Sequence, residues 1–355
     1  MRKNHFGKLL AGFILTSLIV TGCGSEGAAG DSENKSGKKA EKTVAIVTDV
    51  GGVDDKSFNQ SAWEGLQEWG EEHGYEKGTN GYNYLHSKSD SEYITNLNTA
   101  AGNGFSTIFG IGHRIKDAVE EVADQKNNVD FVIIDAVIDG KDNVTSVTFR
   151  DNEAAFLAGI AAAKTTKTQK VGFVGGQNGE VIDRFEAGFR QGVAAVDEKI
   201  EVDVQYVGTF GDPAKAKSQA AAMFNGGADI IFHAAGNSGN GVFSEARDIK
   251  KNDPDRELWV IGVDRDQSAE GEVDGMNITL TSTLKGVGKA VIEISNMSLE
   301  DKFPGGEKII FGLAEEGVDL TDGQLSDETK AAVEEFKQQI IDGKITVMEK
   351  PSELK

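Results

Sequence analysis

Residues 43–65, TVAIVTDVGGVDDKSFNQSAWEG, contain the pattern that decides the fold. The apolar, mostly β-branched run from Val44 to Val47 is typical of a buried strand. A polar loop with two glycines follows, and a helical pattern begins at Phe58, with Ser57 as the expected N-cap. The order strand, glycine loop, helix predicts a ligand site beyond the carboxyl end of this strand, because open α/β sheets bind ligands there.

A second stretch, residues 171–192, repeats the arrangement as VGFVGGQNGEVIDRFEAGFRQG. A gapless alignment with an offset of 127 (171 − 44) pairs Phe58 with Phe185. Two such units predict two similar lobes. If the lobes face each other, these two rings approach one cleft and can hold a flat ligand by stacking, worth about 0.5–1.5 kcal/mol for each ring. The alternative is that both phenylalanines are core residues of their helices.

Strand and helix patterns alternate along the rest of the chain, which predicts right-handed βαβ connections and parallel sheets flanked by helices. The further expected strands lie at residues 81–86, 107–111, 131–134, 145–149, 202–207, 230–233, 259–263, 276–281 and 308–312. The length of 355 residues favours two domains.

The N-terminal residues have the composition of an export signal rather than of a folded domain. Basic residues precede an apolar stretch, Leu9 to Val20, that is too short for a secure transmembrane helix. Cys23 is the only cysteine of the chain, so an intramolecular disulfide is impossible. A small-residue site followed by a single cysteine resembles the lipobox of bacterial lipoproteins, which implies cleavage before Cys23 and acylation of its sulfur; the alternative is an ordinary secretory signal. The polar residues 24–42 predict a flexible linker.

The chain is acidic and matches no enzyme template. Its formal net charge of −21 argues against a nucleic-acid partner, because phosphates would be repelled. The first glycine loop lacks the third glycine of GxGxxG, and the sequence contains no GxxxxGK[ST], HExxH or GxSxG motif. We therefore expect no cofactor, no metal site and no enzymatic activity.

Polar residues follow several of the expected strands. Asp49, Asp135 and Asp264 each come directly after an apolar run, and Gly236 follows another. An ionised carboxylate can accept hydrogen bonds from two neighbouring hydroxyls, as on a ribose. Lys285 is expected to reach the same rim and to pair with Asp264. The alternatives are turn-forming acids and a surface lysine.

The chain resembles the basic membrane protein family, the purine nucleoside receptor group of ABC-transporter substrate-binding lipoproteins. The resemblance rests on Thr48-Asp49, Gly51-Gly52 and the run DDKSFNQ at residues 54–60. It extends from about residue 42 to about residue 320. Further matching segments are Ile134-Asp135, RFEAGF at residues 184–189, Ala235-Gly236, GVD at residues 262–264 and TLK at residues 283–285.

The resemblance implies a type I periplasmic-binding-protein fold, in which two Rossmann-like lobes are joined by a three-segment hinge. The crossovers are expected near residues 149–152, 264–271 and 303–306. The implied domains are a signal peptide at 1–22, a linker at 23–42, an N-terminal lobe at 43–150 plus 265–304, and a C-terminal lobe at 151–264 plus 305–355.

The resemblance also implies a role for each site residue. Phe58 and Phe185 would stack on the nucleobase, with Phe210 as an alternative to Phe185. Two residues would hydrogen-bond base edges, namely Asn59 and Asp135. Four would hold the ribose or contribute backbone, namely Asp49, Asp264, Lys285 and Gly236.

The expected function is capture of a nucleoside, in particular a purine nucleoside, by a monomeric lipoprotein anchored to the outer face of the cell membrane. The implied partners are an ABC permease and its ATPase subunits. The alternatives are another flat or hydroxylated ligand such as riboflavin or a sugar, an NAD-type oxidoreductase, and a surface lipoprotein without a role in transport.

Overall fold

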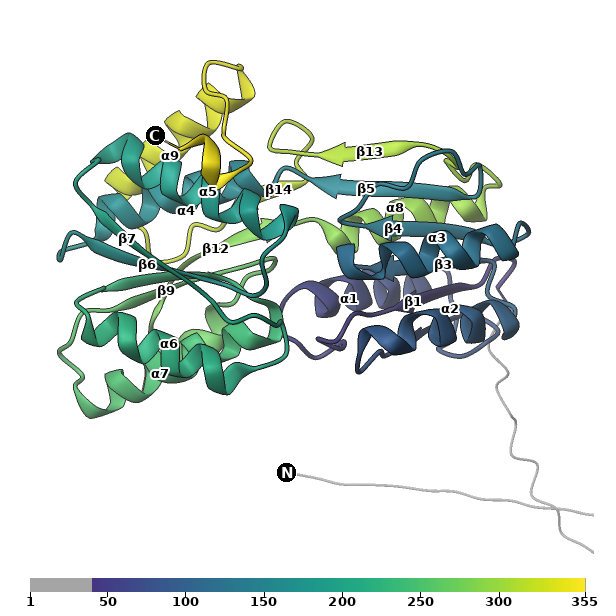
Figure 1. The fold of residues 1–355 in the computed structure, drawn as a ribbon, viewed down its shortest axis with the longest axis horizontal. Coiled ribbons are helices and arrows are strands. Elements are labelled where there is room, and N and C mark those ends of the chain that lie inside the picture. Colours follow the sequence, from purple (N-terminus) through teal and green to yellow (C-terminus); the bar gives the residue numbers. More distant parts are fainter. Residues whose placement is uncertain (1–39, 355) are drawn as a thin grey trace, which may run out of the picture. The chain divides into compact units, whose positions relative to one another are not determined.

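The computed structural model describes residues 40–354. The expected signal peptide, the lipidation site Cys23 and most of the expected linker therefore lie outside the described residues. Within residues 40–354, two six-stranded sheets are each flanked by helices on both faces (Figure 1). This confirms the α/β fold with parallel sheets. No helix in this part of the chain combines the length and the apolar character needed to cross a membrane.

The first sheet is parallel throughout and has the strand order β13-β5-β4-β3-β1-β2. Its strands are β1 (Val44–Val47), β2 (Tyr82–Leu85), β3 (Thr107–Ile111), β4 (Asp130–Ile134), β5 (Val144–Phe149) and β13 (Lys308–Phe311). Its flanking helices are α1 (Phe58–Glu72) and α8 (Val287–Leu299) on one face, and α2 (Tyr93–Gly102) and α3 (Lys116–Gln125) on the other. We call this sheet and its helices the first lobe.

The second sheet has the order β14-β12-β9-β8-β6-β7, with β14 antiparallel to β12. Its strands are β6 (Lys170–Gly175), β7 (Glu201–Tyr206), β8 (Ile230–Ala234), β9 (Trp259–Gly262), β12 (Thr279–Lys285) and β14 (Val318–Leu320). Its helices are α4 (Asp151–Thr165), α5 (Glu180–Val196) and α9 (Asp327–Ile341) on one face, and α6 (Pro213–Asn225) and α7 (Asn240–Asn252) on the other. A short hairpin pairs β10 (Glu272–Val273) with β11 (Met276–Asn277). We call this sheet and its helices the second lobe.

Burial on both faces explains why the strands are apolar without alternation. In β1, Val44 and Ile46 pack toward α1 and α8, whereas Ala45 and Val47 pack toward α2 and α3. All four side chains are fully buried. Since successive side chains of a strand point to opposite faces, only a sheet covered on both sides buries all of them.

Helices α4 and α5 approach each other so closely that glycine is required at the contact. A Cβ at Gly188 would lie 2.1 Å from the carbonyl oxygen of Asn152, and a Cβ at Gly192 would lie 2.1 Å from that of Phe156. This close packing brings the start of α4 next to the N-terminal half of α5, where Arg184 and Phe185 lie.

The described chain crosses between the sheets at three places, and two differ from the expected hinge segments. The first crossover lies at Arg150, between β5 and α4. The second lies at Gly286, because β12 continues to Lys285 and pairs with β9 in the second sheet. The third lies at residues 312–317, because β13 pairs with β5 in the first sheet before β14 joins the second. Residues 265–304 were expected to belong to the first lobe. Of the two elements at residues 279–299, α8 does belong to it, whereas β12 belongs to the second lobe.

Candidate ligand-binding site

One cavity is lined by both lobes at the carboxyl ends of the strands. Every residue predicted for the site borders it, namely Asp49, Phe58, Asn59, Asp135, Phe185, Gly236, Asp264 and Lys285. Further lining residues include Asp55, His113, Ile182, Phe210 and Asn237. The structure therefore brings together groups that are up to 236 positions apart (285 − 49).

The loop after β1 folds around two buried carboxylates. Asp49 Oδ1 accepts hydrogen bonds from the backbone N–H of Gly51 at 2.9 Å and from Asn59 Nδ2 at 2.7 Å. Asp55 Oδ2 accepts from the Asn59 backbone N–H at 3.0 Å and from Asn59 Nδ2 at 2.9 Å. The Asn59 amide is thus clamped through its nitrogen. Its Oδ1 is buried without a hydrogen-bond partner among the described residues, which leaves an acceptor at the cavity wall.

Ser57 occupies the N-cap position of α1, as predicted from sequence, but its side chain forms no capping hydrogen bond. Asp55 accepts hydrogen bonds from the first N–H groups of the helix, at Asn59 and Gln60, and so satisfies donors that an N-cap side chain would otherwise serve. The Ser57 hydroxyl instead donates to Asp264 Oδ2 in the other lobe. A residue expected to stabilise a helix therefore contacts the site.

Three residues at strand ends turn sharply into the cavity. Asp135 follows β4 with φ 69°, Asp264 follows β9 with φ 68°, and Gly236 follows β8 with φ 54°. Side-chain-bearing residues seldom adopt this left-handed region, which costs on the order of 1–3 kcal/mol for each. Such backbone strain occurs preferentially at functional sites, where surrounding contacts stabilise it.

Burial dominates the electrostatics of the acidic residues. It raises the pKa of Asp264 to about 7, although Lys285 and the hydrogen bond from Ser57 favour the ionised form. It raises the pKa of Asp49 to about 6 against the hydrogen bonds from Gly51 and Asn59. Both carboxyl groups therefore titrate near neutral pH. A ligand that donates hydrogen bonds to them would favour their ionised forms.

Lys285 forms ion pairs, but not with the side chain predicted for it. Its ammonium donates to Asp135 Oδ2 at 2.7 Å and lies 3.0 Å from Asp151 Oδ1. The predicted partner, Asp264, is bonded by the backbone of Lys285 instead: the Lys285 backbone N–H donates to the Asp264 carbonyl oxygen at 2.9 Å. Burial alone would lower the pKa of the ammonium, but the surrounding carboxylates outweigh it and raise the pKa, so Lys285 is charged.

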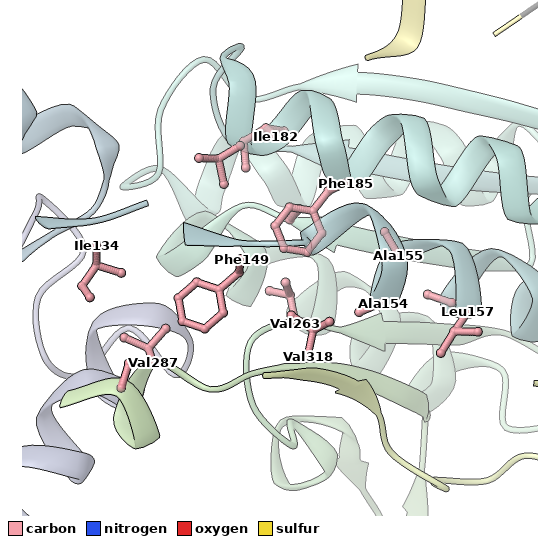
Figure 2. Packing of buried hydrophobic residues seen from close by; sticks show 14 of the residues in the cluster. Ile134, Phe149, Ala154, Ala155, Leu157, Ile182, Phe185, Val263, Val287 and Val318 are labelled. Atoms are coloured by element: carbon pink, nitrogen blue, oxygen red, sulfur yellow. The ribbon is translucent and has the colours of Figure 1, made fainter. Parts of the chain in front are cut away.

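Aromatic rings surround this ammonium. Lys285 Nζ lies 5.1 Å from the ring centroids of Phe58 and Phe149 and 5.8 Å from that of Phe185. Figure 2 shows Phe149, at the end of β5, and Phe185, on α5, among apolar side chains of the core, with Val263 nearby. Cations are attracted to ring faces within about 6 Å, so the three rings favour the charged lysine.

The phenylalanines differ in how much ring surface they offer to a ligand. Phe58 is half-buried at the first position of α1, whereas Phe185 is 4% exposed and packs edge-on against Phe232 at 6.2 Å. Phe210 is half-buried, and its ring lies against Gly176, where a Cβ would be 2.4 Å away. It meets the edge of His113 from the other lobe at 6.2 Å.

Polar contacts join the two lobes beside the cavity. Asn240 Nδ2 donates to the carbonyl oxygen of Asp55 at 3.1 Å, and Gln267 Nε2 donates to that of Lys56 at 2.8 Å. Arg114 donates to Gln177.

Asp55 and His113 line the cavity but were not predicted from the sequence. Asp55 is an acid just before a helix, and His113 follows a strand and a glycine, and both of these patterns could have identified them.

The chain is similar in sequence to known proteins over most of its length. The family model described as "ABC transporter substrate-binding protein PnrA-like" matches residues 42–351. The "ABC transporter nucleoside-binding protein BmpA" of Lactococcus lactis is 48% identical over 94% of this chain and 95% of its own length. The "Basic membrane protein A" of Borreliella burgdorferi is 32% identical over 96% of this chain and 95% of its own length.

Solved structures also include similar folds. A solute-binding protein of an ABC transporter system from Aeropyrum pernix is 26% identical and has a TM-score of 0.77, covering 87% of this chain and 94% of that one. A sugar-binding protein of a sugar ABC transporter from Bacillus halodurans has a TM-score of 0.59 at 15% identity, covering 80% of this chain and 98% of that one; it supports the fold alone.

Proposed function

Because the chain belongs to the PnrA-like family of ABC transporter substrate-binding proteins, which are binding proteins rather than enzymes, we propose that its cavity binds a nucleoside, in particular a purine nucleoside. The single observation that carries the proposal is the meeting of half-buried aromatic rings with buried carboxylates in one cavity. A nucleoside has a flat apolar base and a hydroxyl-rich sugar, and the two kinds of lining group match its two halves.

The base would stack on Phe58 and on a second aromatic ring. Phe210 suits this role better than Phe185, because it keeps part of its ring exposed while Phe185 is packed against Phe232. Asn59 Oδ1 and Asp135 Oδ1 are buried acceptors without a partner among residues 40–354. Ring N–H and amino groups of a base would satisfy them, and leaving such acceptors unpaired costs about 1–3 kcal/mol each.

The ribose would lie against Asp264, Asp49 and Lys285. Ionised carboxylates accept hydrogen bonds from hydroxyls, and an ammonium donates to a hydroxyl oxygen. Gly236 would offer its backbone beside the sugar. A free base has no sugar hydroxyls to form these additional hydrogen bonds, so the site would favour the riboside.

Cleft closure would couple binding to transport. The ligand would contact both lobes and therefore favour the closed arrangement by its extra affinity for that state. An ABC permease would then recognise the closed form and accept the ligand. Acylation of Cys23 would hold the protein at the outer face of the cell membrane, and release of a Cys23→Ala protein into the soluble fraction would support this anchoring.

Calorimetric titration of the purified protein tests the proposal. The panel should contain adenosine, guanosine, inosine, cytidine, the matching free bases, riboflavin and sugars. Tightest binding of purine nucleosides is expected. Asp264→Asn should lower affinity for ribosides more than for free bases, whereas Asp248→Asn, which changes an exposed ion-paired acid outside the cavity, should change neither. Binding of sugars alone, or an equal loss for ribosides and bases, would contradict the assignment.

Uptake measurements test the role in transport. Deleting the gene should reduce nucleoside uptake by the cells. Normal uptake together with nucleoside binding in vitro would point instead to a surface lipoprotein without a role in transport.

A further inference from the structure

A buried row of charged side chains lies behind the sugar end of the candidate site. Arg184 Nε and Nη2 donate to Asp151 Oδ2 at 3.2 Å and 3.0 Å. The other oxygen of Asp151 lies 3.0 Å from the Lys285 ammonium, which in turn donates to Asp135 at 2.7 Å. The row alternates in charge and is neutral as a whole. The Asp151 side chain is 0% exposed and that of Lys285 is 3% exposed.

Asp151 has no contact with the cavity itself. Asp135 and Lys285 line the cavity, whereas Asp151 does not. Asp151 is the first residue of α4, directly after the crossover from β5, and Lys285 is the last residue of β12, directly before the crossover to α8. The ion pair therefore connects two of the chain segments that join the lobes, and it reaches the cavity only through the lysine.

The carboxylate of Asp151 lies between the two cations. Arg184 occupies one carboxylate oxygen through two N–H groups, and the Lys285 ammonium faces the other. An ammonium carries three N–H donors, so Lys285 can donate to Asp135 and still offer an N–H to a ligand hydroxyl. Without Asp151, the flexible lysine would be free to turn toward Asp135 and Asp264, two cavity-lining carboxylates that also attract its charge.

We propose that Asp151, held by Arg184, is a positioning residue that fixes the Lys285 ammonium for the sugar hydroxyls of the ligand. The inference rests on the proposed function, since it assumes that the ligand is a nucleoside. It predicts a selective effect: loss of Asp151 weakens binding of ligands with 2′ and 3′ hydroxyls and spares ligands that lack them.

The test compares adenosine with 2′,3′-dideoxyadenosine by calorimetry, using the full chain. Asp151→Asn is expected to weaken adenosine binding at least tenfold and dideoxyadenosine binding less than threefold. In a Lys285→Met background the same substitution should weaken adenosine binding less than threefold, because the group through which it acts is gone. A merely structural role would lower both affinities in both backgrounds.

Two further variants keep the test decisive. Glu153→Gln is the matched control, because Glu153 is a buried, ion-paired acid at the same end of α4 that pairs with Arg150 instead of Lys285; it should leave both affinities unchanged. If Asp151→Asn does not fold, Asp151→Glu retains the charge but displaces the carboxylate, and it should show the same selectivity with a smaller loss.

The outcomes separate this inference from the proposed function. If the wild-type protein binds neither nucleoside, the proposed function fails and the inference fails with it. If the wild-type protein binds adenosine but the Asp151 variants lower both affinities equally, or lower neither, only the positioning role is overturned.

Discussion

The two copies of the strand-loop-helix unit, β1 to α1 and β6 to α5, have diverged most in their loops. The loop of the first lobe runs through residues 48–57 and buries Asp49, Asp55 and Ser57. The loop of the second lobe is confined to residues 176–179, GQNG, and contains no carboxylate. One unit therefore supplies hydrogen-bonding groups to the cavity, while the other supplies apolar side chains from its helix, such as Ile182.

The difference in loop length also separates the two phenylalanines that the sequence repeat aligns. Phe58 is the first residue of α1, but α5 begins at Glu180, so Phe185 lies more than one turn inside its helix. A residue at a helix start can face the cavity mouth, whereas one inside the helix packs on the sheet. Alignment of a repeat thus identifies equivalent sequence positions without establishing equivalent roles.

The contrast between the two phenylalanines would disappear if both rings served only to stabilise the core. Phe185→Ala is expected to lower the free energy of unfolding by about 3–5 kcal/mol, because it removes a core ring and leaves a cavity. Phe58→Ala should lower it by less than half of that, because Phe58 is half-buried. Urea denaturation of both variants measures the difference in unfolding free energy. Equal losses would mean that both rings are core residues.

Phe58 should matter more for ligand affinity than for stability. Phe58→Ala is expected to weaken nucleoside binding at least tenfold, which corresponds to about 1.4 kcal/mol or more, through lost stacking and lost apolar contact. The matched control is Phe336→Ala, because Phe336 is a half-buried ring that packs on Phe156 outside the cavity. An unchanged calorimetric affinity of the Phe58 variant would contradict the assignment.

The buried carboxylates predict how the polar side of the site depends on pH. Burial raises the pKa of Asp264 to about 7, and ligand hydroxyls should favour its ionised form. Affinity should therefore increase with pH and be about tenfold weaker at pH 6 than at pH 8. Calorimetry in buffers with different ionisation enthalpies should detect proton release on binding, and Asp264→Asn should flatten the profile.

The stability of the ligand-free protein should change with pH in the opposite direction. A carboxyl group with a raised pKa binds its proton more tightly in the folded state than in the unfolded state. The stability that Asp264 contributes is thus present at low pH and is lost as the pH rises from about 4, the unfolded value, to about 7. A wild-type profile identical to that of Asp264→Asn would argue against a buried titrating group.

The smallest effect should come from the contact that the shorter loop makes with the first lobe. Gln177→Ala removes the partner of Arg114 but leaves the contacts of Asn240 and Gln267 across the cavity. Because a single partly exposed polar contact is worth at most about 1 kcal/mol, nucleoside affinity should fall by no more than about fivefold by calorimetry. A tenfold loss would show that this loop contributes to binding as strongly as the longer one.

Local patterns sufficed to predict the fold class and several of the residues that gather at the cavity. The strand at Thr107–Ile111 and the acids after β1, β4 and β9 are encoded by short stretches, and parallel strands bring their carboxyl ends to one edge. Long-range pairing could not be read in this way. The ion pairs of Lys285 with Asp135 and Asp151 join residues more than a hundred positions apart.

Two of the three hinge segments and the role of Ser57 were mispredicted for the same physical reason. The run TLTSTLK does not indicate that β12 pairs with β9. In the same way, the identity of Ser57 does not indicate that Asp55 already accepts hydrogen bonds from the first N–H groups of the helix. Each outcome depends on competition between partners that come from different parts of the chain.

The last two strands have a consequence for how the protein is made. β13 completes the edge of one sheet and β14 the edge of the other, and both come after the other strands of these two sheets in the described part of the chain. A nascent polypeptide therefore lacks one strand of each sheet until residues 308–320 have left the ribosome. A product truncated before Lys308 would leave β5 and β12 as bare sheet edges, which are open to pairing with other chains.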